Sequence, residues 1–160
     1  GLTGTNIYNM YWCRISWSAT LTANVILKYI GQKFADDDVL ASFYPDLMQA
    51  AILDGFETGK TTWTEQHYMA AEHIIRHLKK NGTLKSGKQI FDPTLFVDAS
   101  CHKVAEIVYT AFGEPYAERK KEAAKAYAEA ISMKNLVLDE DMDGKISPLE
   151  LQSRQGWLYR

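Results

Sequence analysis

Apolar residues recur at three- and four-residue spacing along several long stretches of the chain, and this spacing is typical of amphipathic α-helices. The clearest stretch runs from Tyr116 to Met133, is rich in Ala, Glu and Lys, and follows the helix-breaking sequence Gly113-Glu114-Pro115. Its apolar positions are Ala123, Ala124, Tyr127, Ala128 and Ile131. The pattern predicts one long helix here with this side buried.

A second long helix is predicted between Thr62 and Lys80 by the same periodicity. The residues along one of its sides are Met69, Ala70, His73, Ile74, His77 and Leu78. Asn81-Gly82 is expected to end this helix, because glycine readily takes the left-handed conformation found just after a helix.

Three other stretches also predict helices: Ile7–Ile30, which can contain one break, Asp38–Leu53 and a shorter one over Cys101–Phe112. Ser100 is expected to be the N-cap of the last one, because serine is a preferred residue at that position. Strand signals are weak throughout. Leu84–Val97 contains a glycine and a proline, and it predicts a loop with at most one extended segment.

Length and pattern together predict an all-α fold of five or six helices. The chain has 160 residues, which favours a single compact domain over residues 1–160. No internal repeat with a period of about 20–50 residues is visible.

Charge and hydropathy exclude two classes of partner. The net charge is −2, and the richest basic stretch, Arg119-Lys120-Lys121, alternates with Glu118 and Glu122 as on a solvated helix face. We therefore expect no nucleic-acid partner, because such partners require a basic stripe or patch. No run of about 18 apolar residues occurs, so no membrane span is expected.

The cellular compartment is left open by the sequence. No signal peptide is visible after Gly1, although a mature secreted chain would look the same. Cys13 and Cys101 are far apart and form no CxxC motif. Two buried thiols are favoured over one disulfide, and both interpretations stay open.

The strongest chemical pattern is the twelve-residue segment Asp139–Glu150, which reads DEDMDGKISPLE. Ca²⁺ is a hard cation that binds about six to eight oxygen atoms, and a chain with alternating carboxylates can curl around it. Without a cation, so dense a group of carboxylates would repel itself. The expected ligands are the side chains of Asp139, Asp141 and Asp143, the backbone carbonyl of Lys145, Ser147 directly or through water, and both carboxylate oxygens of Glu150.

Two local features support this register. Gly144 is placed at the sharp bend of the loop, where a positive φ angle is needed. Ser147-Pro148-Leu149-Glu150 has the pattern of a helix start, with serine at the N-cap, proline at the first helical position and glutamate three residues after the cap. The segment closely resembles the loop of the EF-hand family, which implies a helix–loop–helix motif over about residues 125–156 and calcium as the bound ion.

The residues flanking the loop differ from those of calmodulin-like EF-hands. Four apolar residues are expected in the incoming helix, and the positions hold Ile131, Lys134, Asn135 and Leu138. The outgoing positions hold Leu151, Arg154 and Gln155. A regulatory EF-hand opens an apolar groove between its two helices. The few apolar residues here therefore favour a structural role for calcium over a sensor role.

EF-hands of this family usually occur in pairs, and no second intact loop is present. The segment Asp54–Glu65 has the family residues at its first, sixth and last positions, the sixth being Gly59. Phe56 and Thr58 replace two strong oxygen donors. Two interpretations remain open, a vestigial EF-hand loop and a turn that leads into the next helix.

Other candidate sites are weaker. His73 and His77 are four residues apart on one helix, a spacing that can hold a transition metal, but no acidic residue completes the set. We interpret them as partly buried helix histidines. No GxSxG, Walker A or GxGxxG motif occurs, so catalytic residues stay unknown and no nucleotide cofactor is expected.

Aromatic residues are numerous and gather near both ends of the chain: Tyr8, Tyr11, Trp12, Trp17, Trp157 and Tyr159. They are interpreted as core packing or as an apolar or sugar-stacking pocket. Calcium-regulated photoproteins are similar in combining EF-hands with an aromatic-rich core. The sequence from Gly113 to Arg119, with the helix after it, resembles outer helices of α/α-toroid carbohydrate-active enzymes.

Three hypotheses about function follow. The first is a calcium-binding helical protein in which Ca²⁺ is structural, acting as a binding or interaction module with a protein or carbohydrate partner. The second is a carbohydrate-active α/α-helical enzyme, or a fragment of one, with a structural calcium loop. The third is a multi-EF-hand sensor or ligand carrier with decayed loops. The first is favoured, so enzymatic activity is not expected.

Overall fold

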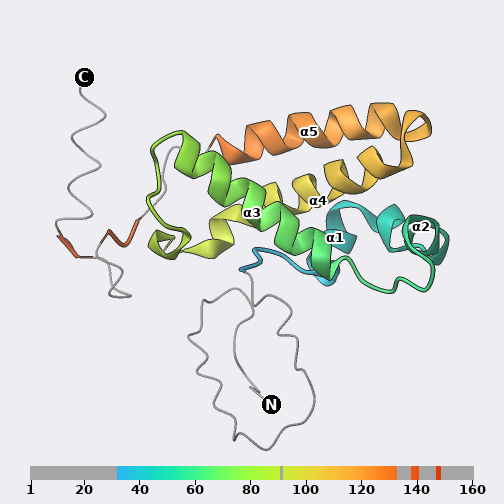
Figure 1. Ribbon diagram of the computed structural model, residues 1–160, viewed down its shortest axis with the longest axis horizontal. Helices are drawn as coiled ribbons and strands as arrows, with labels where there is room; N and C mark the ends of the chain where they lie inside the picture. The colour runs from blue at the N-terminus through green and yellow to red at the C-terminus, as the bar shows by residue number, and fades with distance from the viewer. Residues whose placement is uncertain (1–31, 91, 133–137, 141–146, 149–160) are drawn as a thin grey trace, which may run out of the picture.

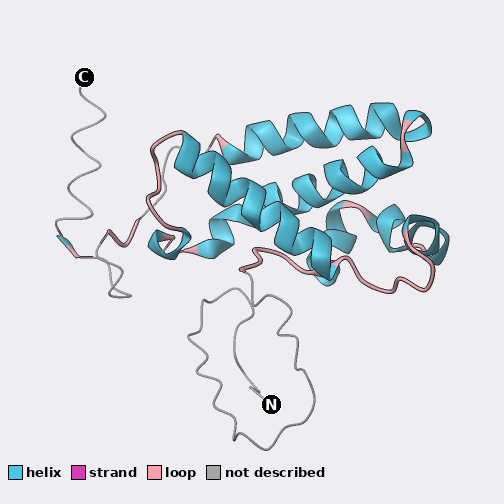
Figure 2. Cartoon of the chain, in the orientation of Figure 1, coloured by secondary structure: helices cyan, strands magenta, loops and turns pink. Residues whose placement is uncertain are grey.

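The computed structural model describes residues 32–90, 92–132, 138–140 and 147–148. In this part of the chain it contains five α-helices, four short 3₁₀ helices and no strand, which confirms the predicted all-α fold (Figure 2). The helix predicted over Ile7–Ile30 lies outside the described residues.

The α-helices are α1 (Asp37–Phe43), α2 (Ala50–Phe56), α3 (Thr64–Lys80), α4 (Val97–Phe112) and α5 (Ala117–Ile131). The 3₁₀ helices are η1 (Pro45–Met48), η2 (Gly87–Gln89), η3 (Pro93–Phe96) and η4 (Glu114–Tyr116). The long helix α4 packs against both α3 and α5, and α1 and α2 lie at one end of these three (Figure 1). No helix among the described residues is long and apolar enough to cross a membrane.

Helix α3 confirms the predicted helix and its end. Asn81 is the C-cap and Gly82 follows with φ +71°, as glycine permits. The buried side is rotated from the predicted one, because Ala70, Ile74 and Leu78 are buried whereas Met69, His73 and His77 are exposed. The other residues that α3 buries are Gln66, His67 and Ala71.

The prediction of a single helix over Asp38–Leu53 is wrong, since the structure divides this stretch into α1, η1 and α2. The break comes at Tyr44 and Pro45. Proline has no backbone N–H, and it disfavours helical geometry in the residue before it. Tyr44 accordingly has φ −136° and ψ 69°.

The start predicted for the next helix was also wrong. Helix α4 begins at Val97, and Ser100 is buried inside it rather than capping it. The chain leads into α4 through η3. There the Asp92 side chain accepts a hydrogen bond from the Thr94 amide, and Pro93 takes the first helical position. This start lies upstream of the serine because aspartate followed by proline is itself a strong helix-start signal.

Helix α5 confirms the helix predicted over 116–133, with ends shifted by one or two residues. Gly113 has φ +72°, which lets the chain reverse through η4 so that α5 packs on α4. Of the predicted apolar side, Ala123 and Ile131 are buried, Ala124 and Tyr127 are half-buried, and Ala128 is exposed.

The core consists of two clusters. One lies where α1, η1 and α2 meet α3 and α4, and its largest buried side chains are Trp63, Tyr109, Leu40 and Leu47. The other lies towards the opposite end of α3 and contains Phe34, Ile74, Ile90 and Phe96. The second cluster also receives Leu138, which immediately precedes the predicted calcium loop.

Candidate functional site

The start of the predicted calcium loop is anchored on the helical body. The Asp139 amide donates to the Gln89 carbonyl at 2.9 Å, and Leu138 forms an antiparallel bridge with Ile90. Asp139 is only 3% exposed. This is the one short extended pairing within Leu84–Val97 that the structure describes. The stretch also contains η2 and η3, so the prediction of a simple loop with one extended segment is only partly met.

The side chain of Gln89 stabilises the turn whose carbonyl accepts the hydrogen bond from Asp139. The side-chain oxygen of Gln89 accepts hydrogen bonds from the Lys85 amide at 2.7 Å and the Ser86 amide at 3.0 Å, and the residue is 6% exposed. The turn that presents the Gln89 carbonyl is therefore tied to its own side chain. The position of Asp139 depends on this turn and on the apolar contacts of Leu138.

The remaining predicted ligands are described only in part. Ser147 is half-buried, whereas Asp141, Asp143, Lys145 and Glu150 lie outside the described residues. Within the described ranges no group of three or more His, Cys, Asp or Glu side chains is arranged to hold a metal, and Asp139 is the only carboxylate ligand of the predicted set found there. The ligand set therefore stays a prediction.

On the incoming side of the loop the structure describes α5 and Leu138, whereas residues 133–137 lie outside the described residues. Helix α5 ends at Ile131, with Ser132 as its C-cap, and Leu138 is already in the bridge to Ile90. The outgoing half of the predicted motif lies outside the described residues apart from Ser147 and Pro148.

The segment Asp54–Glu65 connects two helices. Asp54 lies in α2 and Glu65 in α3, and the Asp54 carboxylate accepts a hydrogen bond from the Gly59 amide at 2.9 Å. Gly59 has φ +76°. Phe56, at the third position of the segment, packs edge-on against Trp63 with ring centroids 5.1 Å apart, so this position serves the core. The arrangement agrees with both open interpretations, because each requires a turn between helices.

The histidine pair on α3 has separate surroundings. His73 is exposed, and burial of part of its ring, with Lys103 and Arg76 nearby, lowers its pKa. Nε2 of His77 is hydrogen-bonded to the side-chain nitrogen Nδ2 of Asn81 at 3.0 Å. No third metal ligand joins them among the described residues.

A partly buried polar contact that sequence reasoning missed joins α1 to α3. The Asp37 carboxylate accepts from the Trp63 amide at 3.1 and 3.2 Å, and it lies 3.2 Å from Nε2 of His67. Burial acts to raise the pKa of Asp37, but the hydrogen bonds from His67 and the Trp63 amide outweigh it and lower that pKa. Asp37 thereby provides a partner, from another helix, for the backbone N–H of Trp63, the N-cap residue of α3. Because His67 is 1% exposed, we interpret this contact as structural.

A second histidine, His102, lies in an aromatic group with Phe43 and Tyr44. Its Nδ1 is 2.9 Å from the Tyr44 hydroxyl, and both rings approach it edge-on. Burial raises the pKa of Tyr44 to about 12, so the phenol keeps its proton and can donate it to a neutral imidazole. The adjacent Cys101 is a buried free thiol whose pKa burial raises to about 12, which makes it unreactive at neutral pH.

We expect the melting temperature to fall when the pH is lowered from 7.5 to 5. Burial lowers the pKa of His102 despite the carboxylates of Asp98 and Glu129. A lowered histidine pKa stabilises the fold above the unfolded value of 6.5, and this stabilisation is lost as the pH falls through the folded value. His102→Gln should make the fall in melting temperature measurably smaller in thermal scans followed by circular dichroism. An unchanged pH dependence in that variant would contradict this role for His102.

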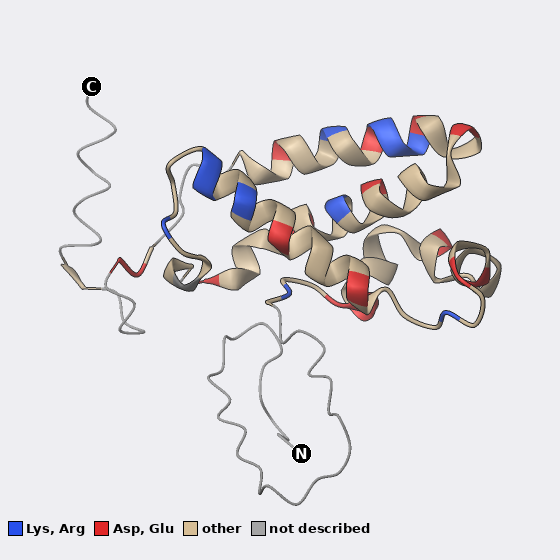
Figure 3. Ribbon diagram, in the orientation of Figure 1, with Lys and Arg blue, Asp and Glu red and all other residues tan. Residues whose placement is uncertain are grey.

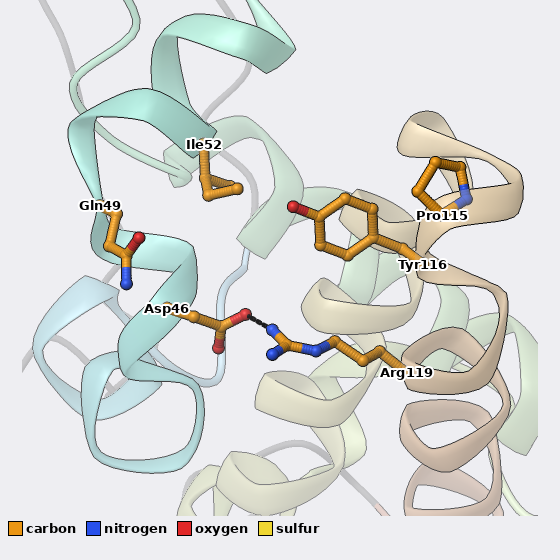
Figure 4. Close-up of a pocket in the computed structure, with 6 residues that line it drawn as sticks. All are labelled: Asp46, Gln49, Ile52, Pro115, Tyr116 and Arg119. Atoms are coloured by element: carbon orange, nitrogen blue, oxygen red, sulfur yellow. Dashed lines mark hydrogen bonds and ion pairs between the residues drawn. The ribbon is translucent and has the colours of Figure 1, made fainter.

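A surface pocket of about 420 Å³ lies between η1 and α2 on one side and η4 and α5 on the other (Figure 4). We call it the polar pocket, and its lining residues are Asp46, Gln49, Ile52, Pro115, Tyr116 and Arg119. Arg119 forms an ion pair with Asp46 across it, and the Tyr109 hydroxyl donates to the same carboxylate at 3.0 Å. This pocket was also missed by sequence reasoning.

Charged side chains elsewhere are dispersed. Figure 3 shows acidic and basic residues interspersed along α5, where Lys121 pairs with Glu118 and Lys125 with Glu129. This confirms, for the helix, the solvated face that was predicted around Arg119-Lys120-Lys121.

Two features of the described chain are therefore candidate sites, the anchored start of the predicted calcium loop and the polar pocket. No protein-family model, curated protein or solved structure matches the chain.

Proposed function

We propose that the segment Asp139–Glu150 binds one Ca²⁺ and that the ion fastens the C-terminal part of the chain to the helical body. The observation that carries this proposal is the anchored position of Asp139, whose amide is bonded to Gln89 and whose residue is 3% exposed. A first ligand attached to the core in this way transmits the binding energy of the ion to the fold.

The donor set suits calcium rather than a softer metal. All six predicted ligands bind through oxygen, and neither cysteine nor histidine occurs in the loop. Oxygen-only sites with several carboxylates favour Ca²⁺ or Mg²⁺, and the bidentate glutamate at the last position favours the larger ion. When bound, the ion would supply positive charge that offsets the repulsion among the acidic side chains.

The anchoring contacts support a structural role. Leu138 is partly buried against the second core cluster and is paired with Ile90, so the start of the loop is already packed against the body. A sensor requires helices that separate to expose an apolar groove. Here the apolar residue next to the loop is used in the core, which leaves it unavailable for such a groove.

Isothermal titration calorimetry with Ca²⁺ tests the proposal. The wild-type chain is expected to bind one ion, and the double variant Asp139→Ala, Glu150→Ala is expected to lose high-affinity binding, because the first and last ligands of the loop are removed. The matched control is Asp54→Ala, Glu65→Ala, which removes the same residue types from the same positions of the other segment.

The control variant should bind one Ca²⁺ with the wild-type affinity. Binding that survives in the Asp139, Glu150 variant would refute the site. Loss of binding in the control variant alone would instead assign calcium to 54–65 and favour the vestigial EF-hand interpretation of that segment.

A further inference from the structure

We propose that the polar pocket is a binding site for a neutral sugar ring, independent of the calcium loop. Its volume of about 420 Å³ falls in the range of about 300–1,000 Å³ that is usual for small-molecule sites. The pocket is open to solvent, since the side chain of Arg119 is 55% exposed and that of Asp46 is 26% exposed.

The charges in the pocket favour a neutral ligand. Arg119 and Asp46 form an ion pair and compensate each other's charge. An anion attracted to the guanidinium would also meet the carboxylate, and a cation attracted to the carboxylate would meet the guanidinium. A ligand without any charged group can hydrogen-bond to both groups and leave the pair intact.

The polar groups match a ligand with several hydroxyls. A guanidinium only donates hydrogen bonds, a carboxylate only accepts them, and the Gln49 amide does both. Gln49 is exposed, and its side chain makes no capping bond to α2. Neighbouring sugar hydroxyls each donate and accept, so they can pair with such planar groups two at a time.

The apolar part of the pocket matches the other property of a sugar, its face of C–H groups. Ile52, Pro115 and the ring of Tyr116 line the pocket beside the polar groups (Figure 4). Aromatic rings with a hydroxyl combine an apolar surface with a hydrogen-bonding end. A purely apolar ligand would remove water from the Arg119–Asp46 pair without offering partners to its remaining donors and acceptors, which is unfavourable.

The walls are held in place before a ligand binds. Tyr116 stacks on Tyr109, with ring centroids 5.6 Å apart and planes 10° apart, and it also packs against Phe112 at 5.1 Å. Tyr109 in turn holds Asp46 through its hydroxyl. Side chains fixed in this way lose little conformational freedom on binding, and this favours affinity.

Nuclear magnetic resonance of the ¹⁵N-labelled full chain in Ca²⁺-containing buffer tests the proposal. The probes are the methyl glycosides of glucose, galactose and mannose, with glycine, a zwitterion, and inorganic phosphate, an anion, as comparisons that carry formal charges. At least one glycoside should shift the backbone signals of Gln49 and Arg119 with a saturable dependence on concentration. Glycine and phosphate should not.

Variants assign the effect to the pocket. Gln49→Ala should weaken glycoside binding about five-fold, the loss of one hydrogen bond, and Arg119→Gln should weaken it further. Lys120→Ala, an exposed change on α5 outside the pocket, should bind as the wild type does. Any one of three outcomes overturns the proposal. The first is that no glycoside gives a saturable shift, and the second is that the Gln49 and Arg119 variants bind the glycoside with the wild-type affinity. The third is that glycine or phosphate saturates the pocket instead of a glycoside.

Discussion

Saturating Ca²⁺ is expected to raise the melting temperature of the full chain by about 8–16 °C. An ion bound only to the native state at a concentration about 1,000 times its Kd stabilises that state by about 4 kcal/mol. For a domain of this size, each kcal/mol shifts the melting temperature by about 2–4 °C. Differential scanning calorimetry with and without chelator measures the difference. The effect should reach the helical body, because Leu138 and Asp139 connect the loop to Ile90 and Gln89.

The Asp139→Ala, Glu150→Ala variant should melt at the same temperature with and without Ca²⁺. Binding of a dye to exposed apolar surface separates the structural role from the sensor role. A structural ion should leave dye binding unchanged or reduce it, whereas a sensor should increase it strongly. A strong Ca²⁺-dependent increase in dye binding would contradict the structural role of the ion. It would not contradict the proposal that the loop binds Ca²⁺.

Trp63→Ala should destabilise the protein by about 3–5 kcal/mol, the range for removing a large aromatic side chain from a core. Trp63 is completely buried, and its indole N–H donates to the Leu47 carbonyl at 3.0 Å. It also contacts Phe56 edge-on. The variant loses these contacts, leaves a cavity and removes the hydrogen-bond partner of the Leu47 carbonyl. Urea unfolding followed by far-ultraviolet circular dichroism measures the free energy of unfolding.

Trp63→Phe is the matched comparison. It keeps a ring against Phe56 but loses the indole N–H, so its loss of stability should be clearly smaller than that of Trp63→Ala. Exposed Met69 provides the surface control, and Met69→Ala should change the free energy of unfolding by less than about 0.5 kcal/mol. A Trp63→Ala variant that is as stable as this control would contradict the central position of Trp63 in the first cluster.

The helices were predictable where their signals are local. Helices α3 and α5 follow from apolar spacing and from the glycines that end or precede them, and their observed bounds lie within two residues of the predicted ones. The two errors in helix bounds also have local causes. Pro45 divides the helix predicted over Asp38–Leu53, and the start signal at Asp92-Pro93 precedes Ser100. In both cases a proline decided where a helix begins, because its fixed φ and missing N–H favour the first turn.

The candidate sites were predictable to different degrees. The ligands of the calcium loop are a prediction from twelve consecutive residues, whose spacing is set by the ion. The polar pocket could not be predicted, because Asp46 and Arg119 are far apart in the sequence and meet only when α5 folds back on α4. The same is true of Asp37, which contacts Trp63 and His67 from a different helix.

The sequence by itself determined the all-α class and the two long helices α3 and α5, and it predicts the order of oxygen donors in Asp139–Glu150. These depend on periodicity and spacing within short segments, which the chain specifies locally. Only the tertiary structure decided which side of α3 is buried, where Asp139 is anchored and which residues enclose the polar pocket. Those features depend on contacts between residues distant in the chain, and such contacts arise from the packing of whole helices.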